Sequence, residues 1–137
     1  LGTLKMSLNI CEVKNDSITL SSAAMPPIYL YNSKSKKTEE ILIRGLPLGG
    51  LKNETFDVQK KKFNKDDVLV MLSDGLPEAE NDAGELYDYK RVMKLITKNA
   101  TKTAEEIKDK MIGEVDIWLD GRVPDDDVSI VVIKKNS

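Results

Sequence analysis

The chain has 137 residues, of which 40% are hydrophobic and 32% charged, and its net charge is −2. This composition is typical of an ordinary soluble domain, excludes disordered and collagen-like classes, and gives no basic footprint for nucleic acid. No apolar run approaches the ~20 residues of a membrane-spanning helix, and no signal-peptide pattern opens the chain. The sequence therefore predicts one domain that is long enough to bury a real core.

Two residue counts limit the chemistry that the chain can perform. The only cysteine is Cys11, so no intrachain disulfide can form, which indicates a reducing compartment and favours a small apolar residue in a strand over a nucleophile. There is no histidine, which excludes Ser-His-Asp and Cys-His catalysis and any zinc site built on imidazole. Any remaining chemistry must rest on carboxylates, whose hard oxygen atoms suit magnesium, manganese or calcium.

The first half of the chain is predicted to form strands joined by turns. Leu4, Met6, Leu8 and Ile10 alternate with polar or small residues, which predicts a strand with one face on a core. The turn residues 15–17 follow, and the segment ITLSSA then completes a hairpin. Further strands are predicted at residues 28–31, 41–43, 55–63 and 68–72, separated by Pro26-Pro27, a polar loop at 32–37, the GLPLGG segment at 45–50 and a turn at 64–67.

The second half is predicted to contain two amphipathic helices and a last strand. Apolar residues recur at helical spacing from residue 89 to 96 and from 107 to 119, where Trp118 is assigned to the core. A capping box from Thr103 to Glu106 begins the second helix, which ends near Gly121. Residues 128–133 form a nearly continuous apolar run, typical of a buried strand. Short connections favour antiparallel pairing, so the predicted class is α+β with helices packed on the sheet.

Acidic residues flank two of the predicted strands. Asp74 follows the strand at 68–72, and Asp125, Asp126 and Asp127 precede the strand at 128–133. If these strands are antiparallel neighbours, the acids meet at one edge of the sheet, where like charges repel unless a cation lies between them. Gly75 has no Cβ and would let the backbone turn close to a ligand. The alternative is a plain Asp-Gly turn with its acids in solvent.

Two known patterns compete for the segment MLSDGLPEAEN, residues 71–81. The first is the phospho-accepting aspartate of a receiver domain, which follows a buried strand and precedes a Leu-Pro or Met-Pro pair. Here Leu76-Pro77 comes one residue too early for that spacing. Receivers also alternate strands with helices, whereas this chain places most of its strands first. The receiver interpretation is therefore disfavoured.

The second pattern extends over the whole chain. Its segments are, in order, LGTLKMSLNI, SSAAMPPIYLY, GLPLGG, DDVLVMLSDGLPEAENDAGELY and PDDDVSIVVIK. Together they resemble the C-terminal two-thirds of a bacterial metal-dependent protein phosphatase domain of the stage II sporulation protein E type. That family combines a Thr-Asp-Gly-x-x-Glu-Ala strand end, an Asn-x-x-Gly-Glu loop and a final Asp-Asp-hydrophobic-Thr strand.

The resemblance implies a fold and an incomplete metal site. The fold would be an α-β-β-α sandwich of antiparallel sheets, and residues 1–137 would be a single partial phosphatase domain without its N-terminal strands. Asp74 and Asp126 would be ligands of Mg²⁺ or Mn²⁺ in a two-metal centre, with Gly75 and Asp127 in support. Asp125 falls outside the motif. The family's first metal motif, Asp-x-x-Gly-His-Gly, would lie before Leu1, so this chain would hold two of three essential acids.

The sequence departs from the family pattern at several positions. Ser73 and Ser129 stand where the family has threonine. Ala24 and Met25 stand in place of a glycine and a histidine, and Asp88 replaces a common glycine. Any role of the family's histidine is therefore absent from this chain.

The function implied by the resemblance is that of a protein serine/threonine phosphatase in which a metal-activated water attacks phosphorus, with no catalytic side chain beyond the metal ligands. Its substrate would be a signalling phosphoprotein, for example an anti-sigma-factor antagonist. The location would be cytoplasmic, with a membrane anchor elsewhere in the parent left open. This chain alone would be inactive and would self-associate through exposed strand edges. The alternative is a non-catalytic regulatory or pseudo-phosphatase module that binds a partner.

Overall fold

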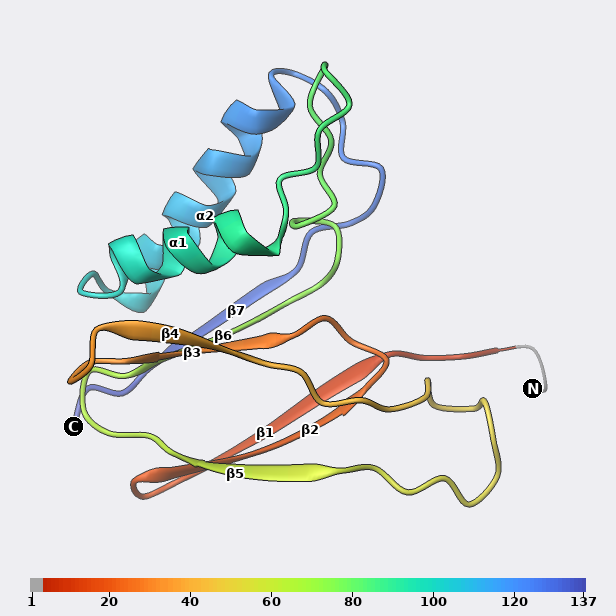
Figure 1. Ribbon diagram of the computed structural model, residues 1–137, viewed down its shortest axis with the longest axis vertical. Helices are drawn as coiled ribbons and strands as arrows, with labels where there is room; N and C mark the ends of the chain where they lie inside the picture. The colour runs from red at the N-terminus through yellow and green to blue at the C-terminus, as the bar shows by residue number, and fades with distance from the viewer. Residues whose placement is uncertain (1–3) are drawn as a thin grey trace.

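The computed structural model describes residues 4–137 and shows three layers, with two helices over one antiparallel sheet and a second sheet beneath it (Figure 1). The sheets have the strand orders β1-β2-β5 and β4-β3-β6-β7. The predicted α+β class is confirmed, and the described residues supply three of the four layers of an α-β-β-α sandwich. The elements are β1 (Leu8–Lys14), β2 (Ser17–Ala23), β3 (Ile28–Asn32), β4 (Lys37–Ile41), β5 (Val58–Lys62), β6 (Val68–Leu72), α1 (Tyr89–Asn99), α2 (Ala104–Leu119) and β7 (Ile130–Lys134).

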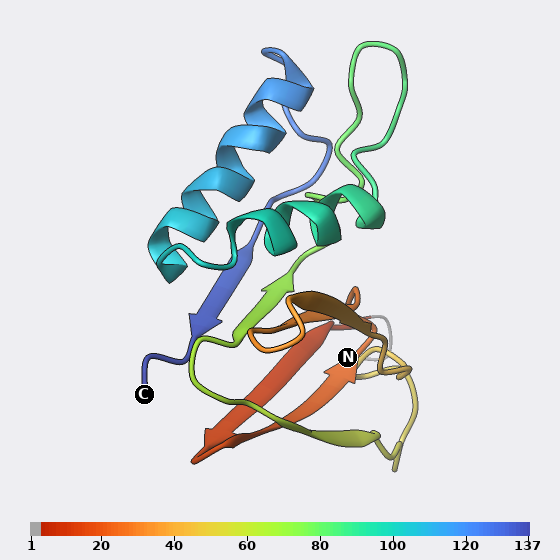
Figure 2. The ribbon, with the colours of Figure 1, turned by 60° about the vertical axis from the view of Figure 1, so that its left-hand side comes forward.

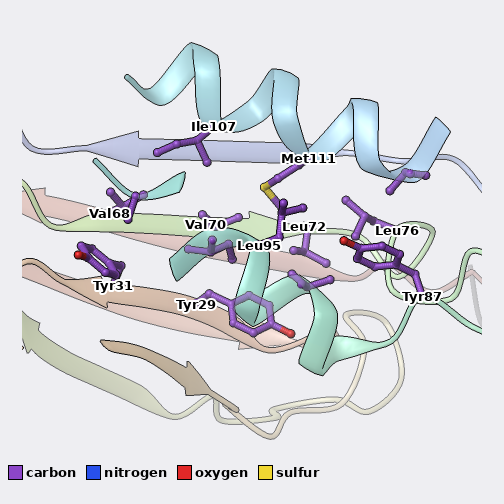
Figure 3. Close-up of a cluster of buried hydrophobic side chains, with 14 of the residues drawn as sticks. Tyr29, Tyr31, Val68, Val70, Leu72, Leu76, Tyr87, Leu95, Ile107 and Met111 are labelled. Carbon is purple, nitrogen blue, oxygen red and sulfur yellow. The ribbon is translucent and has the colours of Figure 1, made fainter. Parts of the chain in front are cut away.

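Two hydrophobic cores lie on opposite faces of the four-stranded sheet. The core under the helices gathers side chains such as Tyr29, Val70 and Met111 (Figure 3). The core between the sheets includes Phe63 and Leu69. Strand β6 contributes to both because successive side chains of a strand point to opposite faces. Its continuous apolar sequence, VLVML, is therefore the consequence of burial on both sides.

The local signals at turns and helix ends are confirmed. Strands β1 and β2 form the predicted hairpin, with Lys14 opposite Ser17. At the start of α2, the Thr103 hydroxyl accepts a hydrogen bond from the Glu106 N–H, and the Glu106 carboxylate accepts one from the Thr103 N–H. Both bonds satisfy N–H groups that a helix start leaves free. Neither helix in the described part of the chain has the length and hydrophobicity needed to cross a membrane.

The prediction that Leu4, Met6, Leu8 and Ile10 form the buried face of the opening strand is wrong, because it is Cys11 of β1 that packs against the core between the sheets. The side chains of Leu4, Met6 and Ile10 are 65%, 55% and 56% exposed, and β1 begins only at Leu8. These residues lie on or before the outer face of the β1-β2-β5 sheet, and nothing among residues 4–137 covers that face as the helices cover the other sheet. Residues 1–3 of the predicted strand lie outside the described residues.

The position predicted for the fourth strand is also wrong. It was expected at residues 41–43, after a loop that included Lys37, but β4 already begins at Lys37 and ends at Ile41. The sequence of β4, KTEEI, contains no run of apolar residues and so gives no strand signal. Charged side chains are tolerated there because β4 is an edge strand. The preceding turn is held by the Asn32 carboxamide oxygen, which accepts hydrogen bonds from the Lys34 and Ser35 N–H groups.

Candidate functional site

The acids singled out in the sequence lie where two neighbouring strands meet. Strand β6 pairs with β7 in antiparallel register, with Leu72 opposite Ile130. The chain leaving β6 toward Asp74 therefore runs beside the chain that enters β7 from Asp126. This pairing is the condition that the sequence argument required, and it is confirmed.

Ser73 joins the two chain segments at this junction. Its hydroxyl donates to the Asp127 carbonyl at 3.1 Å and accepts a hydrogen bond from the Ser129 N–H at 2.9 Å. Its own N–H donates to the Ser129 carbonyl at 3.0 Å. In the sequence alone Ser73 is recognised only as a replacement for threonine, and this bonding role is missed. This role could have been predicted from the sequence, because serine keeps the β-hydroxyl group of the threonine that it replaces.

Gly75 permits the close approach of the two segments. A Cβ placed on Gly75 would lie 2.3 Å from the Asp127 carbonyl oxygen and 3.0 Å from that of Asp126. The sequence predicts that Gly75 lets the backbone come close to a ligand. In the structure, the chain's own backbone occupies the space beside it, so glycine is required to form the junction.

The carboxylates at the junction are of the kind that bind hard cations. Asp126 and Asp127 are exposed, Asp74 is half-buried, and the Asp126 carboxylate accepts a hydrogen bond from the Asp127 N–H at 2.8 Å. Their oxygen atoms suit Mg²⁺ or Mn²⁺. Within residues 4–137, however, no group of three or more acidic, histidine or cysteine side chains is placed to hold a metal ion. The carboxylate oxygen atoms are therefore suitable ligands for Mg²⁺ or Mn²⁺, but the described residues provide too few of them for a complete metal site.

Tyr89, at the start of α1, lies in the field of these acids. Burial raises the pKa of its phenol, and the negative charges of Glu78, Asp74 and Glu40 raise the pKa further. The phenol of Tyr29 has its pKa raised by burial and then by Glu40, and its hydroxyl is buried without a hydrogen-bond partner in the described part of the chain. This end of the sheet therefore combines several negative charges with phenols that stay protonated at neutral pH.

Two departures from the family pattern occur at left-handed backbone positions. Ala24 has φ 54° and Asp88 has φ 72°, and each stands where the resemblance implied glycine. Glycine adopts positive φ without the Cβ penalty that other residues experience, which explains the family's preference. Asp88 has a second function, since its carboxylate accepts a hydrogen bond from the Arg91 N–H and caps α1. Met25, at the family's histidine position, lines a cavity with Ser73 and Ser129.

The loop between β6 and α1 is fixed in place by α2. The Trp118 indole N–H donates to the Ala79 carbonyl at 3.0 Å, and its ring meets Tyr87 edge to face. Arg91 lies 4.5 Å over the same ring. Trp118 is therefore a structural residue, as predicted, and it anchors the segment that follows Asp74.

The family model described as "Stage II sporulation protein E (SpoIIE)" matches residues 4–136 of this chain. A curated relative is Protein IcfG of Synechocystis sp., which is 24% identical over 130 residues. That match covers 93% of this chain and 20% of Protein IcfG.

Solved phosphatase domains share the fold. The phosphatase domain of SpoIIE from Bacillus subtilis (Mn presoaked) superposes with a TM-score of 0.68 and 18% identity over 96% of this chain. The SiaA-PP2C domain of Pseudomonas aeruginosa superposes with a TM-score of 0.73 and 13% identity over 88% of this chain. The chain spans only 56% and 47%, respectively, of the lengths of those chains. At these identities the likeness establishes the fold.

Proposed function

The chain belongs to the stage II sporulation protein E family, and we propose that it forms part of a Mg²⁺- or Mn²⁺-dependent protein phosphatase that hydrolyses phosphoserine and phosphothreonine. The structural neighbours of this chain are phosphatase domains. The observation that carries the proposal is the Ser73 junction, which holds the segments bearing Asp74 and Asp126 against each other.

In this proposal each junction residue has its own role. Asp74 and Asp126 bind the metal ions, and Asp127 supports them. Gly75 and Ser73 act through the backbone, because they hold the two acidic segments together and keep the carboxylates in place before any ion binds. Bound divalent ions would supply an activated water and offset the charge of the phosphoryl oxygens.

The remaining metal ligand is proposed to lie outside the printed sequence. The family's Asp-x-x-Gly-His-Gly motif would provide it, and no group of three acids within residues 4–137 takes its place. This chain alone is therefore expected to bind metal weakly and to show little turnover. A complete centre would need the rest of the domain.

The partner in this proposal is a signalling phosphoprotein, for example an anti-sigma-factor antagonist, and the location is the cytoplasm. The substrate assignment rests on the family resemblance, and the location rests also on the single Cys11. Self-association through exposed strand edges is a separate part of the proposal.

A non-catalytic regulatory module is the second candidate. The lack of a three-acid group among residues 4–137 is compatible with both candidates. The two candidates differ in the sequence of the longer protein. An Asp-x-x-Gly-His-Gly motif ahead of this segment supports catalysis, whereas its loss supports a binding module.

Metal binding can be tested on this chain directly. We expect Asp74→Asn and Asp126→Asn each to weaken Mn²⁺ binding at least ten-fold, measured by electron paramagnetic resonance titration. Asp125→Asn is the matched control, because Asp125 is exposed and adjacent in sequence but outside the motif. Equal losses in all three variants would show nonspecific charge attraction and would refute the assigned ligands.

Catalysis is tested in the longer protein that contains this segment. Hydrolysis of p-nitrophenyl phosphate with Mn²⁺ should be lost in Asp74→Asn and kept in Asp125→Asn. Full activity of Asp74→Asn would overturn the metal assignment. Metal binding without hydrolysis of either p-nitrophenyl phosphate or a phosphoserine peptide would favour the non-catalytic module.

A further inference from the structure

The turns at one end of the sandwich gather lysine side chains from two separate parts of the sequence. Both turns lie at the same end of the two sheets, on the left in Figure 1 and again side by side in Figure 2. The net charge of −2 for the whole chain does not reveal this local excess of positive charge. We call the set the lysine surface, and it consists of Lys34, Lys36 and Lys37 between β3 and β4 and of Lys61, Lys62 and Lys65 at the end of β5 and in the turn after it.

Hydrogen bonds hold the two turns against each other. The Ser33 hydroxyl donates to the Lys65 carbonyl at 3.0 Å, and the Ser33 N–H donates to the Asp67 carboxylate at 2.8 Å. The second oxygen of Asp67 accepts a hydrogen bond from the Asn64 N–H, also at 2.8 Å. Asp67 is only 2% exposed, so its carboxylate stabilises the two turns and is not available to the lysine side chains. The lysines are therefore carried by a fixed backbone.

Most of these lysines have no acidic partner in the described part of the chain. Lys61 pairs with Glu39 at 2.6 Å, and none of the other ion pairs among residues 4–137 includes a member of the lysine surface. The side chains of all its members except Lys61 are exposed. Within residues 32–38 and 60–67 the one exposed acid is Asp66. The lysine surface therefore keeps an excess of exposed positive charge.

A hollow of about 460 Å³ lies between the two sheets at the lysine surface. Its lining includes Lys37, Lys61 and Lys62, with Asn32 and Ser35 as neutral polar neighbours and Glu39 as the single acid. Ammonium groups form their strongest hydrogen bonds with anionic acceptors such as carboxylates. The hollow can therefore receive acidic side chains of a bound segment between the two sheets.

The surrounding side chains favour a carboxylate-bearing segment over other polyanions. Single-stranded nucleic acids are bound on exposed aromatic side chains that stack on bases, and membrane surfaces are bound by exposed apolar ones. No large hydrophobic side chain is exposed within residues 32–41 or 60–67. The same ranges contain no arginine, the residue that most often reads guanine in the major groove. An acidic protein segment remains as the polyanion that lysines alone can bind.

The lysine surface is separate from the acidic junction. Strand β6 runs between them, and the extended chain from Asp67 to Asp74 spans roughly 20 Å. The segment expected ahead of Leu1 would have to reach Asp74 and Asp126 beside β7 to complete the metal centre. The lysine surface lies at the other margin, between β4 and β5, and that segment is therefore not expected to cover it.

We propose that the lysine surface is a docking site for an acidic segment, rich in aspartate and glutamate, of a partner protein. The segment lies along the hollow between β4 and β5, where its carboxylates pair with the ammonium groups of Lys37, Lys62 and their neighbours. Surface charges speed and orient association more than they add affinity, so binding at this site is weak and falls as salt is added. Docking goes beyond the proposed phosphatase activity and requires no metal ion.

The test measures binding of a fluorescein-labelled oligoglutamate peptide by fluorescence anisotropy, without metal ions and at low ionic strength. We expect the unmodified chain to bind the peptide, and Lys37→Glu/Lys62→Glu to bind it roughly ten-fold more weakly. Added salt should weaken binding by the unmodified chain. Circular dichroism verifies that each variant is folded. Lys37→Gln/Lys62→Gln, which removes the charges without reversing them, decides the result if the charge reversal prevents folding.

Lys94→Glu/Lys110→Glu is the matched control. Both lysines are exposed and lie on α1 and α2, outside the lysine surface, so the same change of charge there should leave peptide binding intact. An equal loss in this control, or no loss in folded Lys37→Glu/Lys62→Glu, would overturn the proposal.

Three further results would also overturn it. The first is an unmodified chain that does not bind the peptide, and the second is a longer protein containing this segment that does not bind it. The third is equally tight binding of an oligodeoxythymidylate, which would show attraction for any polyanion. Asp74→Asn should leave peptide binding unchanged, so failure of the metal site and failure of the docking site can be distinguished.

Discussion

The two margins of the sandwich formed by residues 4–137 differ in chemistry. At the β4/β5 margin, Lys61 pairs with Glu39 at 2.6 Å, and Lys37 and Lys62 line the gap between the sheets. At the β1/β7 margin, the gap is lined by residues such as Leu8 and Val131. The charged margin is compatible with contact with water, whereas the other margin exposes apolar side chains among the described residues. Two margins of one sandwich can therefore expose very different side chains, and strand order alone does not reveal this difference.

The apolar margin also contains the acidic junction, and the largest expected effect comes from separating its segments. Gly75→Ala should destabilise the fold by about 3 kcal/mol, because the added Cβ meets the Asp127 backbone and not a movable side chain. Urea denaturation measures this change. Gly113→Ala is the control: nothing lies within 4 Å of the added Cβ, so it should stabilise α2 by about 0.5–1 kcal/mol. An unchanged stability in Gly75→Ala would show that the Asp127 backbone can move away from the added Cβ at little cost, and would contradict the prediction.

The Ser73 hydroxyl provides a weaker link at the same place. Ser73→Ala removes the bonds to the Asp127 carbonyl and the Ser129 N–H and should cost about 1–2 kcal/mol. Ser73→Thr keeps the hydroxyl and should cost much less. The stabilities of the two variants are compared by their denaturant midpoints. Equal losses of stability would show that the effect comes from packing and not from the hydroxyl group.

Substitution of Ala24, the residue with positive φ between β2 and β3, should raise the stability of the fold. Ala24 has φ 54°, so Ala24→Gly should stabilise the chain by about 1 kcal/mol, less the added backbone entropy of the unfolded state. Thermal unfolding measures the gain. Ala23→Gly, within β2, is the control and should destabilise the chain, as Ala23 is a buried strand residue. A loss of stability in Ala24→Gly would contradict the strain at this position.

The charged margin should tolerate loss of its ion pair. Lys61 and Glu39 are partly exposed, with side chains 31% and 52% accessible, so their coupling should be about 0.5 kcal/mol or less. A double-mutant cycle with Lys61→Met and Glu39→Gln measures it, and added salt should reduce it. A coupling above about 1 kcal/mol would mean that this margin is held together by specific contacts, as the junction is.

The smallest effect concerns an ion pair that links the two sheets at the C-terminal end of β7. Asp16, in the β1–β2 turn, pairs with Lys135 after β7, and the hydrogen bond and positive charge of Lys135 lower the pKa of Asp16 below its ordinary value of 3.8. Its stabilising contribution is thus present above pH 3.8 and is lost as the pH falls through the lower folded-state pKa. Asp16→Asn should flatten the stability profile in this acid range, and an unchanged profile would contradict the pairing.

Much of the fold follows from local sequence signals. The apolar run of β6 and the period of α1 and α2 led to elements close to those observed. The capping box at Thr103 is present in both of its bonds. The β4 strand was misplaced because an edge strand of lysines and glutamates carries no apolar pattern. The opening strand was taken to be half-buried, since alternation indicates two faces but not which of them has a neighbouring layer.

The candidate site divides in the same way. That acids flank β6 and β7 and that glycine follows Asp74 can be read from residue order alone. The hydrogen bond from Ser73 to Asp127, 54 positions away, and the close approach of Gly75 to the Asp127 backbone are evident only in the folded chain. Such contacts depend on the register of two strands separated by both helices. No short-range pattern encodes that register, which is set when the two cores pack against β6.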